Sequence, residues 1–198
     1  MDDNLKQKVG LFAAASVGTR RDSATGITVE DFVRFEARDA NGNLKWVEEI
    51  PNLVVTEGLN SLLTQYFKGS GYTATWFVGL IDNAGFTALA ATDTAAKITT
   101  AANPPTTNGW QEITAYSESV RQTLVLGTAS AGSIDNTASK AVFSINGTIT
   151  VKGAFLSSID TKGGTTGVLY GEAAFSATRS LVSGDTLTVT QTLTAASA

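Results

Sequence analysis

Few residues of this chain can carry chemistry, and their types exclude most enzyme classes. The 198 residues contain no histidine and no cysteine. The chain therefore lacks the commonest general base and metal ligand, and it also lacks thiol nucleophiles, disulfides and thiolate metal sites. A glycosidase needs only two carboxylates, for which Asp82 with Asp93, or Glu112 with Glu118, are candidates. No motif orients either pair, so we interpret these residues as solvated loop residues and predict that the protein is not an enzyme.

Two further patterns are too weak to define a ligand site. Asp82, Asn83 and Asp93 offer oxygen ligands, but the spacing of a calcium-binding loop is missing. The glycine-rich stretch Lys162–Gly164 fails the spacing of a phosphate-binding loop, and no helix is expected after it. We therefore predict no cofactor and no bound metal.

Composition and charge limit the partners. Charged residues make up 16% of the chain and the net charge is -4, with no basic stripe, so we predict no nucleic-acid partner. No apolar run approaches the roughly 20 residues of a membrane span, and we predict no membrane contact. The short apolar stretch Val9–Val17 follows acidic residues and precedes two arginines, which is the wrong charge order for a secretion signal.

The chain divides into an N-terminal arm, residues 1–29, and one β domain, residues 30–198. The arm is polar and glycine-punctuated, with one apolar patch, Leu11–Ala15. Two interpretations of the patch are equally weighted: a short helix or frayed terminus, or a segment that docks on a neighbouring subunit.

The domain begins with a hairpin and continues with a strand–helix–strand module. Alternation over Glu30–Arg38, followed by Asn41-Gly42, predicts two antiparallel strands joined by a tight turn. Leu53–Val55 reads as a short strand. The next segment, Thr56–Gly69, reads as a helix with Thr56 as N-cap and Gly69 as its end.

The expected helix carries its apolar residues at a spacing that places them on one face. These residues are Leu59, Leu62, Leu63, Tyr66 and Phe67. We expect this face to pack against a sheet. The stretch Tyr72–Ile81 then reads as a central strand with both faces apolar after Trp76, and Gly79 within it predicts a close approach by backbone or by an aromatic ring.

The remaining sequence is dominated by short alternating strands. Residues 82–109 form an Ala- and Thr-rich excursion that is too long to be a simple connection. At the C-terminus Leu187, Val189 and Leu193 alternate with threonines, as in an antiparallel sheet with one wet face. We predict an all-β fold: an antiparallel β-sandwich, jelly-roll-like, with one packed amphipathic helix and an extended N-terminal arm.

The sequence patterns above do not indicate a function, but a resemblance to a known group of proteins does. It is carried by the segments NLVVTEGLN, ATWFVGLI, GWQEITAYSES, KGAFL, KGGTTG, YGEAAFS and SGDTLTVT. In their order these segments resemble a group of tailed-bacteriophage virion proteins, over roughly Leu44 to Thr194. The resemblance implies a structural component of the virion and transfers no catalytic residue. The tract Ala95–Asn108 departs from it, since a shorter segment is expected there.

The first hypothesis is a capsid decoration (cement) protein, made in the host cytoplasm and bound to the outside of the phage head. Its partners would be the major capsid protein and further copies of itself, with a homotrimer as the favoured state. Leu11, Phe12 and Trp46 are the predicted partner contacts. The alternative is a tail or fibre component that touches the host surface through residues 82–109. A third hypothesis is a sugar-binding module that uses Trp46 or Trp110, whereas Trp76 is expected in the core.

Overall fold

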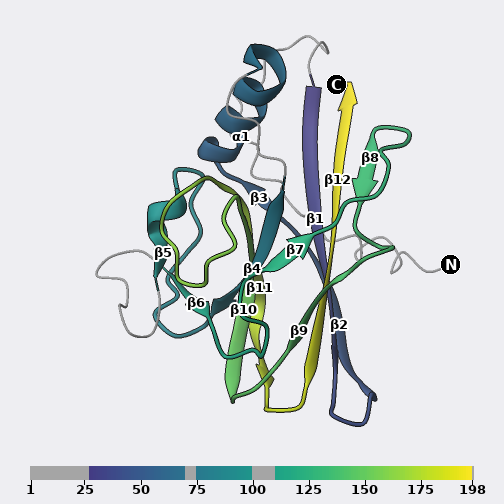
Figure 1. The fold of residues 1–198 in the computed structure, drawn as a ribbon, viewed down its shortest axis with the longest axis vertical. Coiled ribbons are helices and arrows are strands. Elements are labelled where there is room, and N and C mark those ends of the chain that lie inside the picture. Colours follow the sequence, from purple (N-terminus) through teal and green to yellow (C-terminus); the bar gives the residue numbers. More distant parts are fainter. Residues whose placement is uncertain (1–26, 70–74, 100–109, 198) are drawn as a thin grey trace, which may run out of the picture.

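The computed structural model describes residues 27–69, 75–99 and 110–197, and these residues form two β-sheets with a helical segment at one end (Figure 1). The first sheet has the order β2-β1-β12-β8, and β9 also pairs with β12; all its ladders are antiparallel. Its strands are β1 (Ile27–Arg38), β2 (Leu44–Pro51), β8 (Ser133–Asp135), β9 (Ala141–Ser144) and β12 (Thr186–Ser197). β1 begins inside the range predicted as the arm, of which residues 1–26 lie outside the described residues.

The second sheet has the order β3-β11-β10-β4-β6-β5, and β7 pairs with β4 beside β6. Only its β5–β6 ladder is parallel among the described strands. Its strands are β3 (Leu53–Val54), β4 (Trp76–Asp82), β5 (Ile98–Thr99), β6 (Trp110–Ile113), β7 (Gln122–Leu124), β10 (Ile149–Ser157) and β11 (Leu169–Leu181). The helical segments are α1 (Thr56–Leu63), the π-helix η1 (Thr64–Lys68) and the 3₁₀-helix η2 (Ala95–Lys97).

The β1–β2 hairpin forms as its turn chemistry predicts. Gly42 has a φ of 83°, which a glycine adopts without steric cost. The side chain of Asp39 accepts hydrogen bonds from the backbone N–H groups of Asn41 and Asn43, at 2.9 and 2.8 Å. These bonds fix the turn locally, so the register of the two strands follows from the sequence of the loop.

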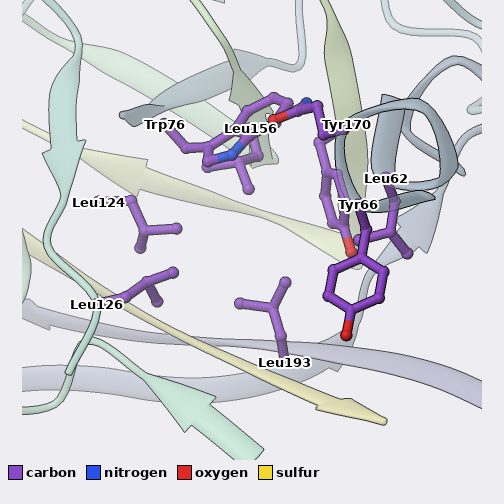
Figure 2. Close-up of a pocket in the computed structure, with 9 residues that line it drawn as sticks. Leu62, Tyr66, Trp76, Leu124, Leu126, Leu156, Tyr170 and Leu193 are labelled. Atoms are coloured by element: carbon purple, nitrogen blue, oxygen red, sulfur yellow. The ribbon is translucent and has the colours of Figure 1, made fainter. Parts of the chain in front are cut away.

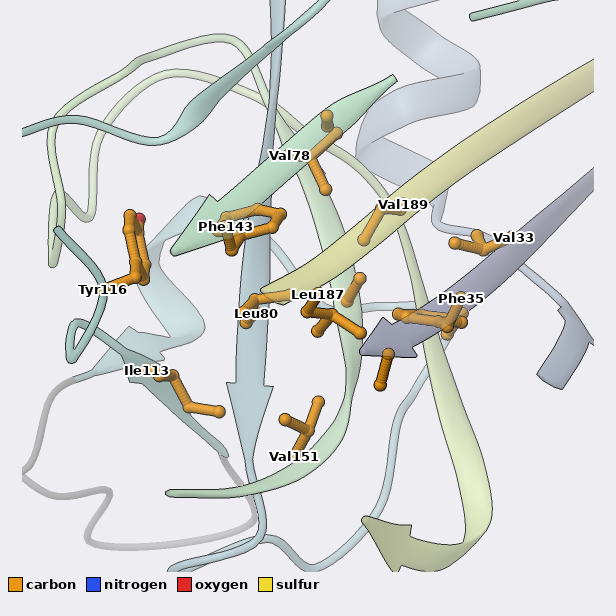
Figure 3. Packing of buried hydrophobic residues seen from close by; sticks show 14 of the residues in the cluster. Val33, Phe35, Val78, Leu80, Ile113, Tyr116, Phe143, Val151, Leu187 and Val189 are labelled. Carbon is orange, nitrogen blue, oxygen red and sulfur yellow. The ribbon is translucent and has the colours of Figure 1, made fainter. Parts of the chain in front are cut away.

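The main core lies between the two sheets. Val33, Phe35 and Ala37 of β1 are buried, as their alternation predicts, and Leu187 and Val189 of β12 lie beside them. Figure 3 shows the labelled side chains of β1 and β12 together with Val78 and Leu80 of β4 and Val151 of β10 from the other sheet. Both sheets therefore share one hydrophobic cluster, which joins them into a single packed unit.

Strands β4 and β10 are buried on both faces. Leu80 and Leu156 belong to the main core, whereas their chain neighbours Ile81 and Phe155 belong to a second cluster on the other face of the sheet. Gly79 allows this packing, because a Cβ atom there would lie 2.2 Å from the ring of Phe155. The predicted close approach of an aromatic ring at this glycine is confirmed.

The second cluster is covered by the chain that follows β4. Within the predicted excursion 82–109, Ala95 and Ile98 are buried, and Phe86 and Leu89 pack against the cluster. The described part of this segment contains η2 and β5 and covers the outer face of the sheet. It is therefore not a free exposed loop. Residues 100–109 lie outside the described residues.

The predicted fold class, all-β with one helix, is confirmed. The finer assignment to a jelly-roll-like sandwich stays a prediction. The packing of the helix, described next, differs from the expected one.

Candidate partner-binding site

The helix is attached to the body through its first turn. Gly58 is its buried residue and lies so close to β11 that a Cβ atom there would be 2.1 Å from the backbone oxygen of Tyr170. The carboxylate of Glu57 accepts hydrogen bonds from the N–H groups of Leu169 and Ala95, at 2.7 and 2.9 Å. One acidic side chain therefore ties the start of α1 to β11 and to the start of η2.

The N-cap differs from the prediction. Val55, not Thr56, is the capping residue, and it makes no side-chain cap bond. The N–H of Thr56 instead donates to the carbonyl of Ala91, at 2.7 Å, in the segment that covers the second cluster. The predicted end of the helix is confirmed, since Gly69 follows η1 in the left-handed conformation with a φ of 65°.

The apolar face of the helix is exposed, which corrects the prediction that it packs against a sheet. The exposed fractions are Leu59 38%, Leu62 41%, Leu63 54%, Tyr66 81% and Phe67 71%. Gly58 in the first turn is the buried residue of α1, and η1 has no buried residue, so the later turns carry the exposed side chains. Periodicity predicts that the five side chains share one face, but it does not say whether that face meets a surface of the same chain.

Part of this face borders a pocket between the sheets. The pocket has a volume of about 270 Å³. It is lined by Leu62, Gln65 and Tyr66 of the helix, Trp76 of β4, Leu124, Leu126, Leu156, Tyr170 of β11 and Leu193 of β12. Figure 2 shows Leu124, Leu126 and Leu193 pointing into the space below Trp76, with Tyr66 beside it. The main core thus continues into an apolar hollow where the sheets end.

The polar groups near the pocket are held neutral or paired. Burial raises the pKa of Tyr170 well above its usual value, and the Asp31 carboxyl raises it further. Burial also raises the pKa of Asp31 from 3.8 to about 7, against the hydrogen bonds that Asn52 and Gln191 donate to it at 2.6 and 2.7 Å. A pocket of this kind suits apolar side chains and offers little to a charged ligand.

A second group of candidate residues surrounds Arg121, whose side chain is completely buried. Its Nε and Nη2 donate to the two carboxylate oxygens of Glu112, at 2.9 and 2.8 Å. The remaining donors reach Ser157 and the carbonyls of Ile159 and Gly164. All five N–H donors of the guanidinium are therefore used within the chain, and this cluster holds the loop after β10 in place.

The predicted carboxylate pairs are not formed as pairs. Glu112 bonds Arg121, whereas Glu118 accepts the N–H of Ser144 at 3.1 Å. The prediction that these carboxylates are solvated is wrong for Glu112 and Asp93, which are 3% and 2% exposed.

The structure brings Asp93 to Glu172. The N–H of Ala90 donates to both carboxylates, at 3.1 Å each, and the indole N–H of Trp110 donates to Glu172 at 2.9 Å. Burial raises the pKa of Glu172 from 4.5 to about 8, and the neighbouring Asp93 raises it further. Trp110 is fully buried, so it cannot form a sugar platform, and its partner Glu172 was missed because no local pattern links it to residues 90–93.

The predicted contact residues fall in different settings. Leu11 and Phe12 lie outside the described residues. Trp46 is half-buried and stacks edge-on against Phe175, with ring centroids 5.7 Å apart, under the guanidinium of Arg179. Its role as a partner contact stays a prediction. Trp76 packs on the core as expected, but it also lines the pocket.

The described residues contain no group of three or more acidic, histidine or cysteine residues that could hold a metal ion. Within the same ranges, no helix is both long and apolar enough to span a bilayer.

Comparison with protein families and with curated proteins adds no relative to this description. No protein-family model matches the chain, and no curated protein matches it significantly. The candidate site is therefore interpreted from its own geometry.

Proposed function

We propose that this chain is a structural protein of a bacteriophage particle that binds the outside of the capsid and reinforces contacts between capsid subunits. The proposal rests on the resemblance of its ordered segments to virion proteins and on one observation, the exposed apolar face of α1 and η1. In this proposal the helix is the part of the molecule that enters the seam between capsid subunits.

The residues best placed for such a contact are Leu63 and Phe67. They are 54% and 71% exposed, and they do not line the pocket. Large apolar side chains that remain in water are costly, and contiguous exposed apolar patches mark interaction sites. Burial of each such side chain contributes about 1.5–3 kcal/mol before entropic costs are subtracted.

The way the helix is attached supports a structural role. The buried Gly58 and the hydrogen-bonded carboxylate of Glu57 hold the first turn against β11, so we expect the later turns to be presented as a rigid element. A rigid apolar anchor loses little conformational entropy when it binds. Many identical weak contacts on a capsid lattice would then add up to a large cost of separating the subunits.

A binding assay with capsids tests the proposed contact. The double substitution Leu63→Ser and Phe67→Ser is expected to weaken binding to capsids by about tenfold or more, as for residues at the centre of an interface. The matched control is Val182→Ser, because Val182 is 48% exposed and lies in the turn between β11 and β12. Equal binding by both variants would contradict the helix as the contact.

Stoichiometry tests the class of protein independently of the contact. Quantitative mass spectrometry of purified virions is expected to find this chain in amounts comparable with the major capsid protein. A few copies per particle would favour the alternative, a tail or fibre component. Absence from the particle would contradict both.

A further inference from the structure

The pocket beside the helix is an apolar hollow that the side chains of the described residues line but do not fill. Three of its leucines, Leu124, Leu126 and Leu193, lie opposite Trp76 and Tyr66 (Figure 2). The space between them has a volume of about 270 Å³. An apolar space of this size is large enough for one or two large side chains, and it gains stability when they replace water. The occupant must therefore present a compact apolar group.

The chain itself carries such a group in the sequence that precedes β1. Residues 1–26 precede β1, and their apolar stretch centres on Leu11 and Phe12. β1 starts at Ile27, which pairs with Ser197 at the end of β12 (Figure 1). The pocket residue Leu193 lies on the same strand, about 14 Å from Ser197 at the usual rise of a β-strand.

The length of the arm permits this contact. An extended chain from Phe12 to Ile27 spans up to about 50 Å, which is several times the distance along β12. A tethered segment acts at an effective concentration in the millimolar range when its tether is long enough for the site. The arm of the same chain therefore competes favourably with any free partner.

We propose that Leu11 and Phe12 of the N-terminal arm dock into the pocket of their own chain. In this proposal the two side chains fill the space that Leu62 and Tyr66 border. Leu63 and Phe67, one residue further along the helix, stay available for another surface. This proposal concerns the isolated chain and does not depend on the proposed capsid contact.

The absence of cysteine from the sequence allows a direct test by disulfide mapping of the full-length protein. One variant carries Ala13→Cys beside the apolar group and Gln65→Cys at the rim of the pocket. The control variant carries Ala13→Cys with Val182→Cys, which lies at the opposite end of β12 but within reach of the extended arm. Both variants keep Leu11, Phe12 and the pocket leucines.

Under mild oxidation the Ala13→Cys/Gln65→Cys variant is expected to form an intramolecular disulfide at least about tenfold faster than the control, because two buried side chains favour the docked arm by more than that factor. Non-reducing electrophoresis separates the cross-linked monomer from a dimer. Adding Leu11→Ser and Phe12→Ser is expected to reduce the rate to that of the control.

Three results would overturn the proposal. Equal rates in the two cysteine pairs would mean that the arm has no preferred docking site. A disulfide between chains would assign the pocket to the arm of a second copy. An unchanged rate after Leu11→Ser and Phe12→Ser would mean that these side chains do not hold the arm. Because no capsid is present in the assay, none of these results bears on the proposed function.

Discussion

The cluster around Arg121 buries a charged side chain, and the helix beside the pocket exposes apolar ones; both placements cost free energy. Only Arg121 has bonding partners in the described chain that offset this cost. Arg121 is buried with all its donors bonded, two of them to the carboxylate of Glu112, which is buried as well. Phe67 is apolar and lies 71% exposed. A buried polar group with all its hydrogen bonds made indicates a structural role, whereas an exposed patch of large apolar side chains indicates where another surface binds.

Breaking the Arg121 cluster is expected to have the largest effect. Arg121→Met leaves the Glu112 carboxylate buried without its ion-pair partner, which costs about 3–5 kcal/mol in the free energy of unfolding. Urea denaturation followed by circular dichroism measures the loss. Arg179→Met is the control, because Arg179 is 33% exposed in its ion pair with Glu48. This substitution is expected to lower the free energy of unfolding by about 1 kcal/mol or less. A similar loss of unfolding free energy in Arg121→Met and Arg179→Met would mean that the buried ion pair is no more important than the exposed one.

Gly58→Ala tests the attachment of the helix and is expected to have the next largest effect. The new Cβ atom would lie 2.1 Å from the carbonyl oxygen of Tyr170, so α1 must move away from β11. Overpacking of this kind costs about 1–3 kcal/mol. Thermal unfolding checks the prediction, with Ser61→Ala on the same helix as control. An unchanged melting temperature for Gly58→Ala would show that the first turn does not fix the helix.

The buried carboxyl of Glu172 is expected to make stability fall as pH rises. Its pKa in the folded protein is raised from 4.5 to about 8, chiefly by burial and then by Asp93, which itself lies 3.6 Å from Lys97. The folded state thus keeps a proton that the unfolded chain releases within this window, and stability is lost progressively between these two values.

The substitution Glu172→Gln is expected to flatten this dependence, because the amide does not ionise. Unfolding free energies measured at several pH values between 5 and 8 give the slope. Asp31, with a pKa of about 7, contributes a slope of the same sign, so Asp31→Asn should remove a separate part of it. A slope unaffected by Glu172→Gln would contradict the buried, protonated carboxyl.

The smallest effect on stability is expected where the exposed side chains are removed. Leu63→Ser with Phe67→Ser should change the free energy of unfolding by no more than about 1 kcal/mol. Both side chains are more than half exposed, and the ring contact of Phe67 is with its exposed neighbour Tyr66. A large loss, measured by the same urea denaturation, would mean that the helix face is covered within the isolated protein. That outcome would weaken the contrast with Arg121.

Local patterns in the sequence determined the elements. Asn41-Gly42 and Asp39 act within a few residues, so the hairpin and its turn follow from the sequence. Alternation fixed the inward side of β1 and β12, and Gly79 indicated a ring contact because only a residue without a side chain leaves that space. These features, and the all-β class with one helix, were predictable for that reason.

Contacts between distant segments were decided only by the tertiary structure. Glu172 is brought to Asp93 and Trp110 by the pairing of strands and the path of residues 83–99, and no short pattern encodes that meeting. The same holds for the carboxylate of Glu112, which looked solvated until Arg121 was placed beside it.

The helix shows most clearly what the sequence alone does not predict. Its sequence determines which residues share a face, because the spacing of side chains along a helix is a local property. Whether that face is buried depends on which distant segments lie opposite it, and Gly58 is the only residue of α1 that the described chain buries. Sequence therefore defined the apolar stripe, while the tertiary structure decided that it faces outward beside an open pocket.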